Sequence, residues 1–258
     1  MFAKELQVMR LEAGLSIAEA ANLLGMKDDG IRKWEKGEST PRELAIEGLC
    51  NRYEAGEAQR KYLLWLYAQR DSPDIVSTHI HEPRPLFIAE QYYQRIYKHE
   101  LLFVPGVLQI EDYHRAPEIS DPRAGEGDLE RVWDLRVRRQ KALQARRGAN
   151  IKIVMGEGVL LGLNRLPCAT QQIEHMLKMV HRGWDLRVER LPYGLMYTGF
   201  DLFLPTGQST PDMPPFTYYE VPDKFEYVES PQRLREYKSM FDHLMNTSVS
   251  LEEYLNAD

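Results

Sequence analysis

The residues of this 258-residue chain most able to bind a polyanion are basic side chains near its N-terminus. Arginine and lysine bind phosphate oxygens, and phosphate neutralisation dominates the affinity of proteins for nucleic acid. The formal net charge is −6, but residues 1–70 hold equal numbers of basic and acidic residues, so the acidic excess lies further along. The N-terminal part can therefore present a local basic face, made of Arg10, Lys27, Arg32, Lys33, Lys36 and Arg42.

Glycine positions and apolar spacing divide residues 5–41 into three short helices separated by tight turns. Three glycines, each able to adopt the left-handed conformation that ends a helix, stand at the expected boundaries: Gly14, Gly25 and Gly37. Ile31 and Trp34 are three residues apart, so we expect both on the inward face of the third helix. A short helix projected in this way fits the major groove of DNA.

Three helix starts have the spacing of a capping box, in which a hydroxyl and a carboxylate three residues apart each accept from an orphan backbone N–H; one of them is Ser250 with Glu253 near the C-terminus. Ser16 and Glu19 have this spacing at the start of the second helix. Thr40 and Glu43 repeat it for a fourth helix, with Pro41 at the first helical position, where a missing N–H costs nothing. The sequence thus specifies these helices by caps as well as by apolar spacing.

The stretch from Leu6 to Pro41 resembles the helix-turn-helix domain of the XRE, or Cro/C1-repressor, class. The resemblance rests on Arg10, Gly14-Leu15-Ser16, Glu19, Ala21, Leu24-Gly25, Ile31, Trp34-Glu35, Gly37 and Pro41. Members of this class read bases with the third helix and hold the phosphate backbone with the start of the second. The resemblance therefore implies DNA-binding positions at Ile17, Lys27, Asp28, Asp29, Arg32, Lys33 and Lys36. It also implies an Arg10–Glu35 pair that braces the first helix against the third, and structural roles for Arg10, Glu35, Ile31 and Trp34.

Two features depart from the pattern of the class. Ile17 stands where glutamine is frequent, and its side chain cannot bond a phosphate. The reading helix opens with Asp28 and Asp29, which phosphates repel. An aspartate can accept from cytosine N4, and acidic residues at a helix N-terminus suit the helix dipole. The two aspartates could therefore read bases, stabilise the helix or weaken DNA binding.

Periodicity predicts an α+β chain: an all-α five-helix domain at residues 1–70, a linker at 71–85 and a mixed α+β domain at 86–258. The linker contains three prolines and no helical period. Helical spacing predicts helices in the C-terminal domain at 86–100, 129–147, 171–182 and 231–248. Apolar runs bounded by Gly or Pro predict strands at 151–155, 184–192, 195–205, 216–221 and 224–230. This order of elements favours an antiparallel or mixed sheet.

Residues 84–255 resemble the C-terminal domain of WhiJ-like regulators, which are actinobacterial proteins of the XRE type. The resemblance rests on FVPGVLQIEDYHRA, RRQKAL, IKIVMGEGVLLGL, VERLPYG and GFDLFL, and departs at Ile110, where many relatives have Thr. In that family the domain has no assigned enzymatic activity, and a small protein is often encoded alongside. The resemblance implies a regulator with a sensing or partner-binding C-terminal domain.

A basic run without an acidic residue lies in the helix predicted at 129–147. Its members are Arg136, Arg138, Arg139, Lys141, Arg146 and Arg147. These side chains spread around a helix, so most would form a solvated face. Arg136, Arg138 and Arg139 are candidates for docking an acidic partner, and a second DNA-contact patch is a further alternative.

Two further groups of residues could bind a ligand or a metal. Aromatic residues of the strand region either pack in the core or line a small-molecule cavity; they are Tyr193, Tyr197, Phe200, Phe203, Phe216, Tyr218, Tyr219, Phe225 and Tyr227. His79 and His81 alternate on an extended segment, as metal ligands can, but no third ligand is near in sequence. We therefore expect no metal site.

Missing patterns exclude several classes of function. The chain has no G-x-S-x-G, H-E-x-x-H or phosphate-binding loop, and Gly156-Glu157-Gly158 lacks the third glycine of a dinucleotide site. We therefore expect neither an enzyme nor a cofactor. No apolar run approaches the roughly 18 residues of a membrane span, and the N-terminus lacks the apolar core of a signal peptide. Cys50 and Cys168 are expected to be two buried thiols.

The sequence thus predicts a cytoplasmic, sequence-specific DNA-binding transcriptional regulator. We expect it to bind double-stranded DNA as a homodimer, with half-sites about one helical turn apart. Its C-terminal domain would sense an effector or bind a partner protein. The alternative is a protein-interaction module controlled by a small partner protein, in which DNA binding is weak or lost.

Overall fold

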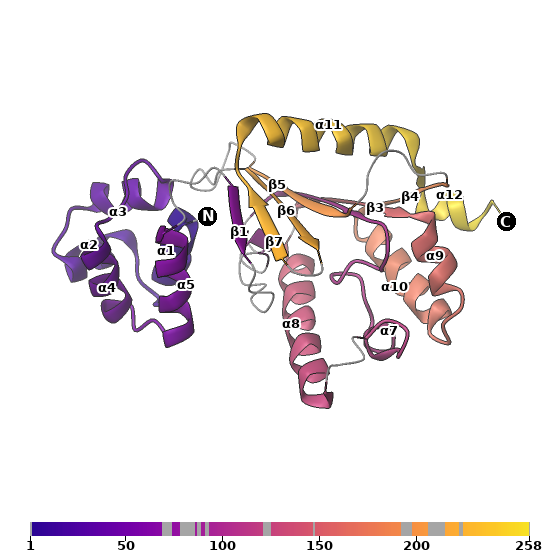
Figure 1. Cartoon of the computed structure of the whole chain (residues 1–258), viewed down its shortest axis with the longest axis horizontal. Coiled ribbons are helices and arrows are strands. Elements are labelled where there is room, and N and C mark those ends of the chain that lie inside the picture. Colours follow the sequence, from indigo (N-terminus) through magenta and orange to yellow (C-terminus); the bar gives the residue numbers. More distant parts are fainter. Residues whose placement is uncertain are drawn as a thin grey trace. The chain divides into compact units, whose positions relative to one another are not determined.

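The computed structural model describes residues 2–68, 74–77, 86, 89–90, 93–120, 125–146, 148–191, 198–205, 215–221 and 224–257. The chain divides into two compact units, a helical N-terminal unit and a C-terminal unit built on a β-sheet (Figure 1). Every element described up to Ala68 is a helix, whereas strands and helices together follow from Asp74 onward. The α+β fold class predicted from the sequence is confirmed.

In the described residues, five helices make up the N-terminal unit. They are α1 (Phe2–Glu12), α2 (Ile17–Leu24), α3 (Asp28–Lys36), α4 (Glu43–Arg52) and α5 (Glu57–Ala68). Each helix contributes small or aliphatic side chains to the interior, among them Leu6, Ala21, Ile31, Leu49 and Leu63. α3 packs against both α1 and α2, so its orientation is set by two neighbours.

Local backbone geometry sets the ends of the short helices. The capping box of α2 is present, since Ser16 Oγ accepts from the Glu19 backbone N–H at 3.2 Å and Glu19 Oε2 accepts from that of Ser16 at 2.8 Å. Gly25 and Gly37 end α2 and α3 with φ angles of 66° and 75°. These angles lie in the left-handed region, where glycine carries no Cβ penalty.

The second predicted capping box is wrong. α4 begins at Glu43 with Arg42 as its N-cap, and no side chain caps it. The chain stays extended through Arg42, with φ −70° and ψ 152°. Pro41 is buried and precedes the helix instead of opening it, and Thr40 is exposed. Thr40 therefore stands too early in the chain to cap the first turn.

The described strands form a mixed eight-stranded sheet. They are β1 (Asp74–Ser77), β2 (Arg95–Glu100), β3 (Asn150–Gly156), β4 (Asp185–Glu189), β5 (Phe200–Leu204), β6 (Phe216–Val221), β7 (Lys224–Val228) and β8 (Val249–Ser250). The strand order is β1-β7-β6-β5-β2-β3-β4-β8. β3 pairs in parallel with β2 and β4, whereas β5 pairs antiparallel with β2 and β6. β1 lies within residues 71–85, the segment expected to be a linker.

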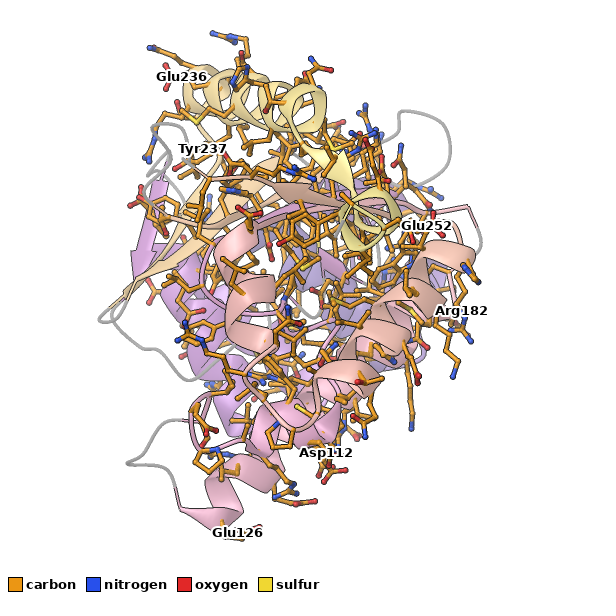
Figure 2. The ribbon with its side chains drawn as sticks, turned by 90° about the vertical axis from the view of Figure 1, so that its right-hand side faces the viewer. Asp112, Glu126, Arg182, Glu236, Tyr237 and Glu252 are labelled. Atoms are coloured by element: carbon orange, nitrogen blue, oxygen red, sulfur yellow. The ribbon has the colours of Figure 1, made fainter. Side chains whose placement is uncertain are left out.

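Helices cover both faces of this sheet. They are α7 (Glu111–Arg115), α8 (Glu126–Gln144), α9 (Glu157–Leu163), α10 (Ala169–His181), α11 (Pro231–Thr247) and α12 (Leu251–Leu255). α11 lies along one face, and α8, α9 and α10 lie on the other (Figure 1). On α11, Tyr237 lies on the side toward the sheet and its neighbour Glu236 on the outer side (Figure 2).

The helix predicted at 86–100 is wrong over residues 95–100, which form the internal strand β2. β2 lies between β3 and β5, and its side chains from Ile96 to His99 are all buried. A strand buried on both faces has a nearly continuous buried run instead of clear alternation. Ile96 and Tyr97 therefore pack on opposite faces of a sheet, although their positions also fit helical spacing.

Alternation along β2 and β5 sorts their side chains between the two faces. Tyr97 and Leu202 are partners in the register and pack under α11, where the Tyr97 ring stacks on Phe241 with centroids 4.9 Å apart. Lys98 and Asp201 are the next partners and have the opposite parity. Around Tyr97 and Leu202 the α11 side of the sheet is thus apolar, whereas the side covered by α8 carries charged residues.

Candidate nucleic-acid interface and an internal cavity

Helix α3 has one buried and one exposed side. Ile31 and Glu35, four residues apart, are 2% and 7% exposed, and Trp34 is half-buried. Glu35, not Trp34, is therefore the deeper neighbour of Ile31 on the inward side. The residues expected to contact DNA here are all exposed: Lys27, Asp28, Asp29, Arg32, Lys33 and Lys36.

A buried ion pair fixes α3 against α1. Arg10 Nε lies 2.6 Å from Glu35 Oε1, and Arg10 Nη2 donates to Glu35 Oε2 at 2.9 Å. The remaining nitrogen, Nη1, donates to the carbonyl of Leu15 at 2.7 Å. One arginine thus joins α1, the turn before α2, and α3. This is the pair that the sequence resemblance implied, and its two-pronged geometry holds the helix in one orientation.

The exposed charges of α3 largely compensate one another. Lys33 Nζ lies 2.8 Å from Asp29 Oδ2, one helical turn away, and Lys36 Nζ lies 3.8 Å from Glu38 Oε1. The hydrogen bond from Lys33, together with its charge, lowers the pKa of Asp29 below its ordinary value. Arg32 makes no ion pair or hydrogen bond within the described part of the chain. Its charge is therefore open to a phosphate or a base edge.

The start of α2 offers few donors to a phosphate. The capping box occupies the backbone N–H groups of Ser16 and Glu19, and Ile17 is half-buried without a polar side-chain group. Hydrogen bonds with Ser16 lower the pKa of Glu19, so a carboxylate charge also lies at this helix end. α3 is therefore the stronger candidate for the interface.

The C-terminal unit contains a cavity of about 560 Å³, lined by residues of β2, β5, β6, α8 and the segment 101–106. Its volume lies in the range of small-molecule sites. Charged side chains are concentrated in its wall: Lys98, Glu100, Arg136, Arg139, Asp201 and Glu220. All belong to one unit, so the cavity is formed within the C-terminal unit alone.

A buried network of charges forms part of the cavity wall. Arg139 Nε and Nη2 each donate to Glu90 at 2.7 Å, and Lys98 Nζ lies 3.1 Å from Glu90 and 2.5 Å from Asp201. Burial raises the pKa of Glu90, but the charges of Arg139 and Lys98 outweigh this effect and lower it overall. These four groups are therefore fixed ions on the sheet face opposite α11.

Buried glutamines hold the segment 104–109, which borders the cavity. Gln140 Nε2 donates to the carbonyl of Gln109 at 2.7 Å, and Gln172 Nε2 donates to that of Leu108 at 2.7 Å. Both donors come from helices, α8 and α10, far from the segment in sequence. The segment is thus a rigid wall, although it contains no regular secondary structure of its own.

The structure separates the residues of the basic run on α8. Arg136 and Arg139 line the cavity, whereas Arg138 between them is exposed. The two lining arginines were expected on a surface for an acidic partner; they lie inward because residues three apart share a helix face, and that face packs on the domain. Sequence reasoning missed Glu90 and Glu100: Glu100 fell in the part of a predicted helix that is strand β2, and Glu90, which is helical, meets Arg139 only through the tertiary fold.

The aromatic residues of the strands divide between the two predicted roles. The Tyr218 side chain lines the cavity, whereas Phe200 and Tyr219, which also border it, pack their rings against α11. Phe203 and Phe216 stack in the core with ring centroids 4.7 Å apart, and Tyr227 is also buried. Tyr193, Tyr197 and the side chain of Phe225 lie outside the described part of the structure.

His79 and His81, which the sequence analysis considered as metal ligands, also lie outside the described residues. Among the residues that are described, no group of three or more His, Cys, Asp or Glu could hold a metal ion. No described helix is both long and apolar enough to cross a membrane. Cys50 and Cys168 are buried free thiols, as the sequence predicted.

Comparison with known proteins bears on both units. The model of a helix-turn-helix domain family matches residues 2–63, and that of a domain of unknown function, DUF5753, matches residues 84–255, well over half of the chain. No curated protein matches. One similar solved structure is that of TrmBL2, an archaeal chromatin protein whose structure shows a novel mode of DNA binding. The two sequences are 12% identical, and the TM-score is 0.32 over 92% of this chain and 88% of that chain. The helix-turn-helix match itself supports DNA binding by the N-terminal unit.

Proposed function

The chain belongs to the family of proteins that carry the domain of unknown function DUF5753, and we propose that it is a sequence-specific, DNA-binding transcriptional regulator of the XRE class. In this proposal α3 enters the major groove of double-stranded DNA. Arg32 contacts a base or phosphate, while Lys27 and Lys36 neutralise the backbone. The observation that carries the proposal is the exposed polar side of a helix that a buried ion pair holds in place.

The C-terminal unit would act as the sensing part of the regulator. Its cavity and the fixed charges around it support the binding of an effector, and no catalytic motif accompanies them, so we propose binding without catalysis. The regulator would act as a cytoplasmic homodimer whose two α3 helices read half-sites about one helical turn apart.

A second candidate function is a protein-interaction module controlled by a small partner protein, with weak or lost DNA binding. The Asp29–Lys33 pair favours this alternative, because it withdraws a cation from the reading helix. The exposed Asp28 adds further repulsion toward phosphates. In this alternative the exposed side of α3 contacts a protein surface.

Selection of binding sites from random double-stranded DNA with the full chain tests the proposal. Titration of the selected sequence should then show that Arg32→Ala weakens specific binding by about tenfold or more, the usual scale for losing one specific arginine contact. Arg60→Ala is the matched control, because it removes a partly exposed cation from α5 instead of α3. If no sequence is enriched, or if Arg32→Ala binds as tightly as the unchanged chain, the interaction module is the better description.

A further inference from the structure

Arg136 is a cation at the cavity wall without a counter-charge in hydrogen-bonding contact among the described residues. Its Nη1 donates to the side-chain oxygen of Gln109 and lies 2.8 Å from His114 Nδ1. His114 Nε2 lies 2.9 Å from the carbonyl of Leu129, which places the proton on Nε2 and leaves Nδ1 as the acceptor. Both partners are therefore neutral: they orient the guanidinium without cancelling its charge. Burial lowers the pKa of Arg136 to about 10, which shows the cost of this arrangement.

Arg139 also places a guanidinium nitrogen beside this part of the cavity. It donates to Glu90 through Nε and Nη2, and its Nη1 has no hydrogen-bond partner within the described chain. A Cβ atom on Gly106 would lie 3.8 Å from Arg136 Nε and 4.0 Å from Arg139 Nη1. Both guanidinium groups therefore border the space beside Gly106. Two guanidinium groups that converge on one open space provide a site for a carboxylate or phosphate group.

Glu100 lines the same cavity from β2. Its carboxyl group forms no hydrogen bond or ion pair with the described residues, and its Oε2 lies 3.0 Å from where a Cβ on Gly199 would stand. Burial and the nearby charge of Asp201 raise the pKa of Glu100 to about 8. At neutral pH it is therefore largely protonated and can donate a hydrogen bond. It suits an acceptor atom on a ligand better than it suits a cation.

Apolar side chains border the cavity between these polar groups. Leu102 and Phe103, which are 77% and 46% exposed, line it. Exposed apolar residues of this size are more informative when they edge a cavity than when they are scattered. The cavity volume of about 560 Å³ also exceeds what an inorganic anion fills. The ligand therefore needs an apolar body as well as an acidic group.

We propose that this cavity binds a small organic anion. Arg136 and Arg139 would bind its carboxylate or phosphate group, Leu102 and Phe103 would contact its apolar body, and Glu100 would donate to an acceptor oxygen. Binding of the anion to the cavity does not depend on the proposed function, whereas the role of the anion as an effector of DNA binding rests on it.

Isothermal titration calorimetry of the full chain with 1-naphthoate tests the site. The uncharged 1-naphthamide is the matched ligand, and 1-naphthyl phosphate separates phosphate from carboxylate recognition. At least one of the two anions is expected to bind about tenfold or more tightly than the amide, because charge-assisted hydrogen bonds are the strong ones.

Substitutions on α8 and in the cavity wall beside it test where the anion binds. Arg136→Gln is expected to weaken anion binding by about tenfold or more. Arg138→Gln removes the same charge from the exposed neighbour on the same helix and is expected to bind as the unchanged chain does. Gly106→Leu keeps every charge but fills the space beside the guanidinium groups, so it should abolish binding even if Arg136→Gln fails to fold.

Equal affinity for acid and amide overturns the proposal, and so does full affinity in Gly106→Leu or Arg136→Gln. The absence of binding by both anions overturns it as well. A gel-shift titration of the selected DNA with and without the bound anion then tests the effector role. Unchanged DNA affinity overturns that role but leaves the anion site standing, whereas failure to select any DNA contradicts only the proposed function.

Discussion

The α3 surface and the cavity wall carry the same types of charged residue, which are exposed to solvent on α3 and buried at the cavity. The Asp29 and Lys33 side chains on α3 are 70% and 50% exposed, so water and salt screen their attraction. Glu90 and Lys98 at the cavity are 0% and 3% exposed. A buried charge has no solvent to replace its partner, so its geometry is fixed. The exposed pair can exchange a partner for a phosphate at little cost, whereas the buried network defines a shape.

Burial decides this difference more than position in the chain does, since Arg10 and Glu35 of the N-terminal unit are as well shielded as the cavity network. The charged residues can therefore be ranked by the property, stability or binding, that their removal should change. Removal of a buried partner should lower stability, and removal of an exposed partner should alter binding. Four substitutions test this ranking, from the largest expected effect to the smallest.

Glu90→Ala should have the largest effect. It leaves Arg139 and Lys98 without their shared partner, and breaking a buried charge pair costs about 3–5 kcal/mol. Hydrogen exchange of peptides from the C-terminal unit, followed through urea denaturation, measures the loss in that unit alone. Glu236→Ala, on the outer side of α11, is the control and should change stability by less than about 0.5 kcal/mol. A loss in Glu90→Ala as small as that of the control would show that the network is not a fixed ion cluster.

Glu35→Gln should destabilise the N-terminal unit by about 2–3 kcal/mol, because Arg10 loses the opposite charge and one of its two acceptors. Glutamine offers Arg10 only one acceptor oxygen, since its other end is an NH2 donor. The loss should appear as faster hydrogen exchange in α1 and α3, and DNA affinity should fall with it. Glu38→Gln is the matched control, since it removes a carboxylate from the exposed pair with Lys36. Equal effects of the two substitutions would contradict a bracing role for the buried pair.

Local signals predicted the N-terminal unit well. Its helix ends depend on residues such as Ser16, Gly25 and Gly37, whose conformational preferences act within one turn. The Asp29–Lys33 pair was also readable, because residues four apart meet on a helix, yet we did not draw it from the sequence. The Thr40–Glu43 cap failed because the same three-residue spacing occurs where the chain does not enter a helix.

The charged cavity could not be predicted from spacing. Arg139 meets Glu90 across 49 residues, and Lys98 meets Asp201 across 103, so both contacts depend on the sheet order. The apolar spacing of 86–100 fitted a helix throughout, and that error concealed Glu100, which lies on β2. Glu90 is helical, and no local pattern shows that it meets Arg139. Arg136 and Arg139 were singled out as a pair, but a helix period does not tell whether their shared face meets solvent or the domain.

Glu100→Gln should stabilise the C-terminal unit at pH 8 and leave its stability unchanged near pH 4.5. The pKa of Glu100 is about 8 in the folded chain against an ordinary value of 4.5, so the unfolded chain releases this proton first as the pH rises. The folded state therefore becomes less stable relative to the unfolded state as the pH rises from 4.5 to 8. Glutamine removes that loss, so the Tm of Glu100→Gln should exceed that of the unchanged chain by about 5 °C or more at pH 8. Thermal melts at both pH values measure it, and a Tm difference independent of pH would contradict a protonated Glu100.

Asp29→Asn should have the smallest effect on stability and a measurable effect on binding. It releases Lys33 from its ion pair and removes a negative charge from the reading helix, so DNA affinity at low salt should rise about two- to fivefold. The gain should shrink as salt is added, because screening weakens interactions between exposed charges. Fluorescence anisotropy with the selected DNA over a salt series measures both.

Asp28→Asn separates the two causes of that gain. Asp28 is equally exposed and makes no ion pair within the described residues, so its substitution removes a negative charge without releasing a lysine. A smaller gain in Asp28→Asn than in Asp29→Asn would show that the exposed pair is exchanged when phosphate arrives. Weaker binding by Asp29→Asn, together with a lost preference for cytosine at one position, would instead show that Asp29 reads a base. In that case this exposed carboxylate would be as fixed in the complex as Glu90 is in the cavity wall, and burial would no longer separate the two regions.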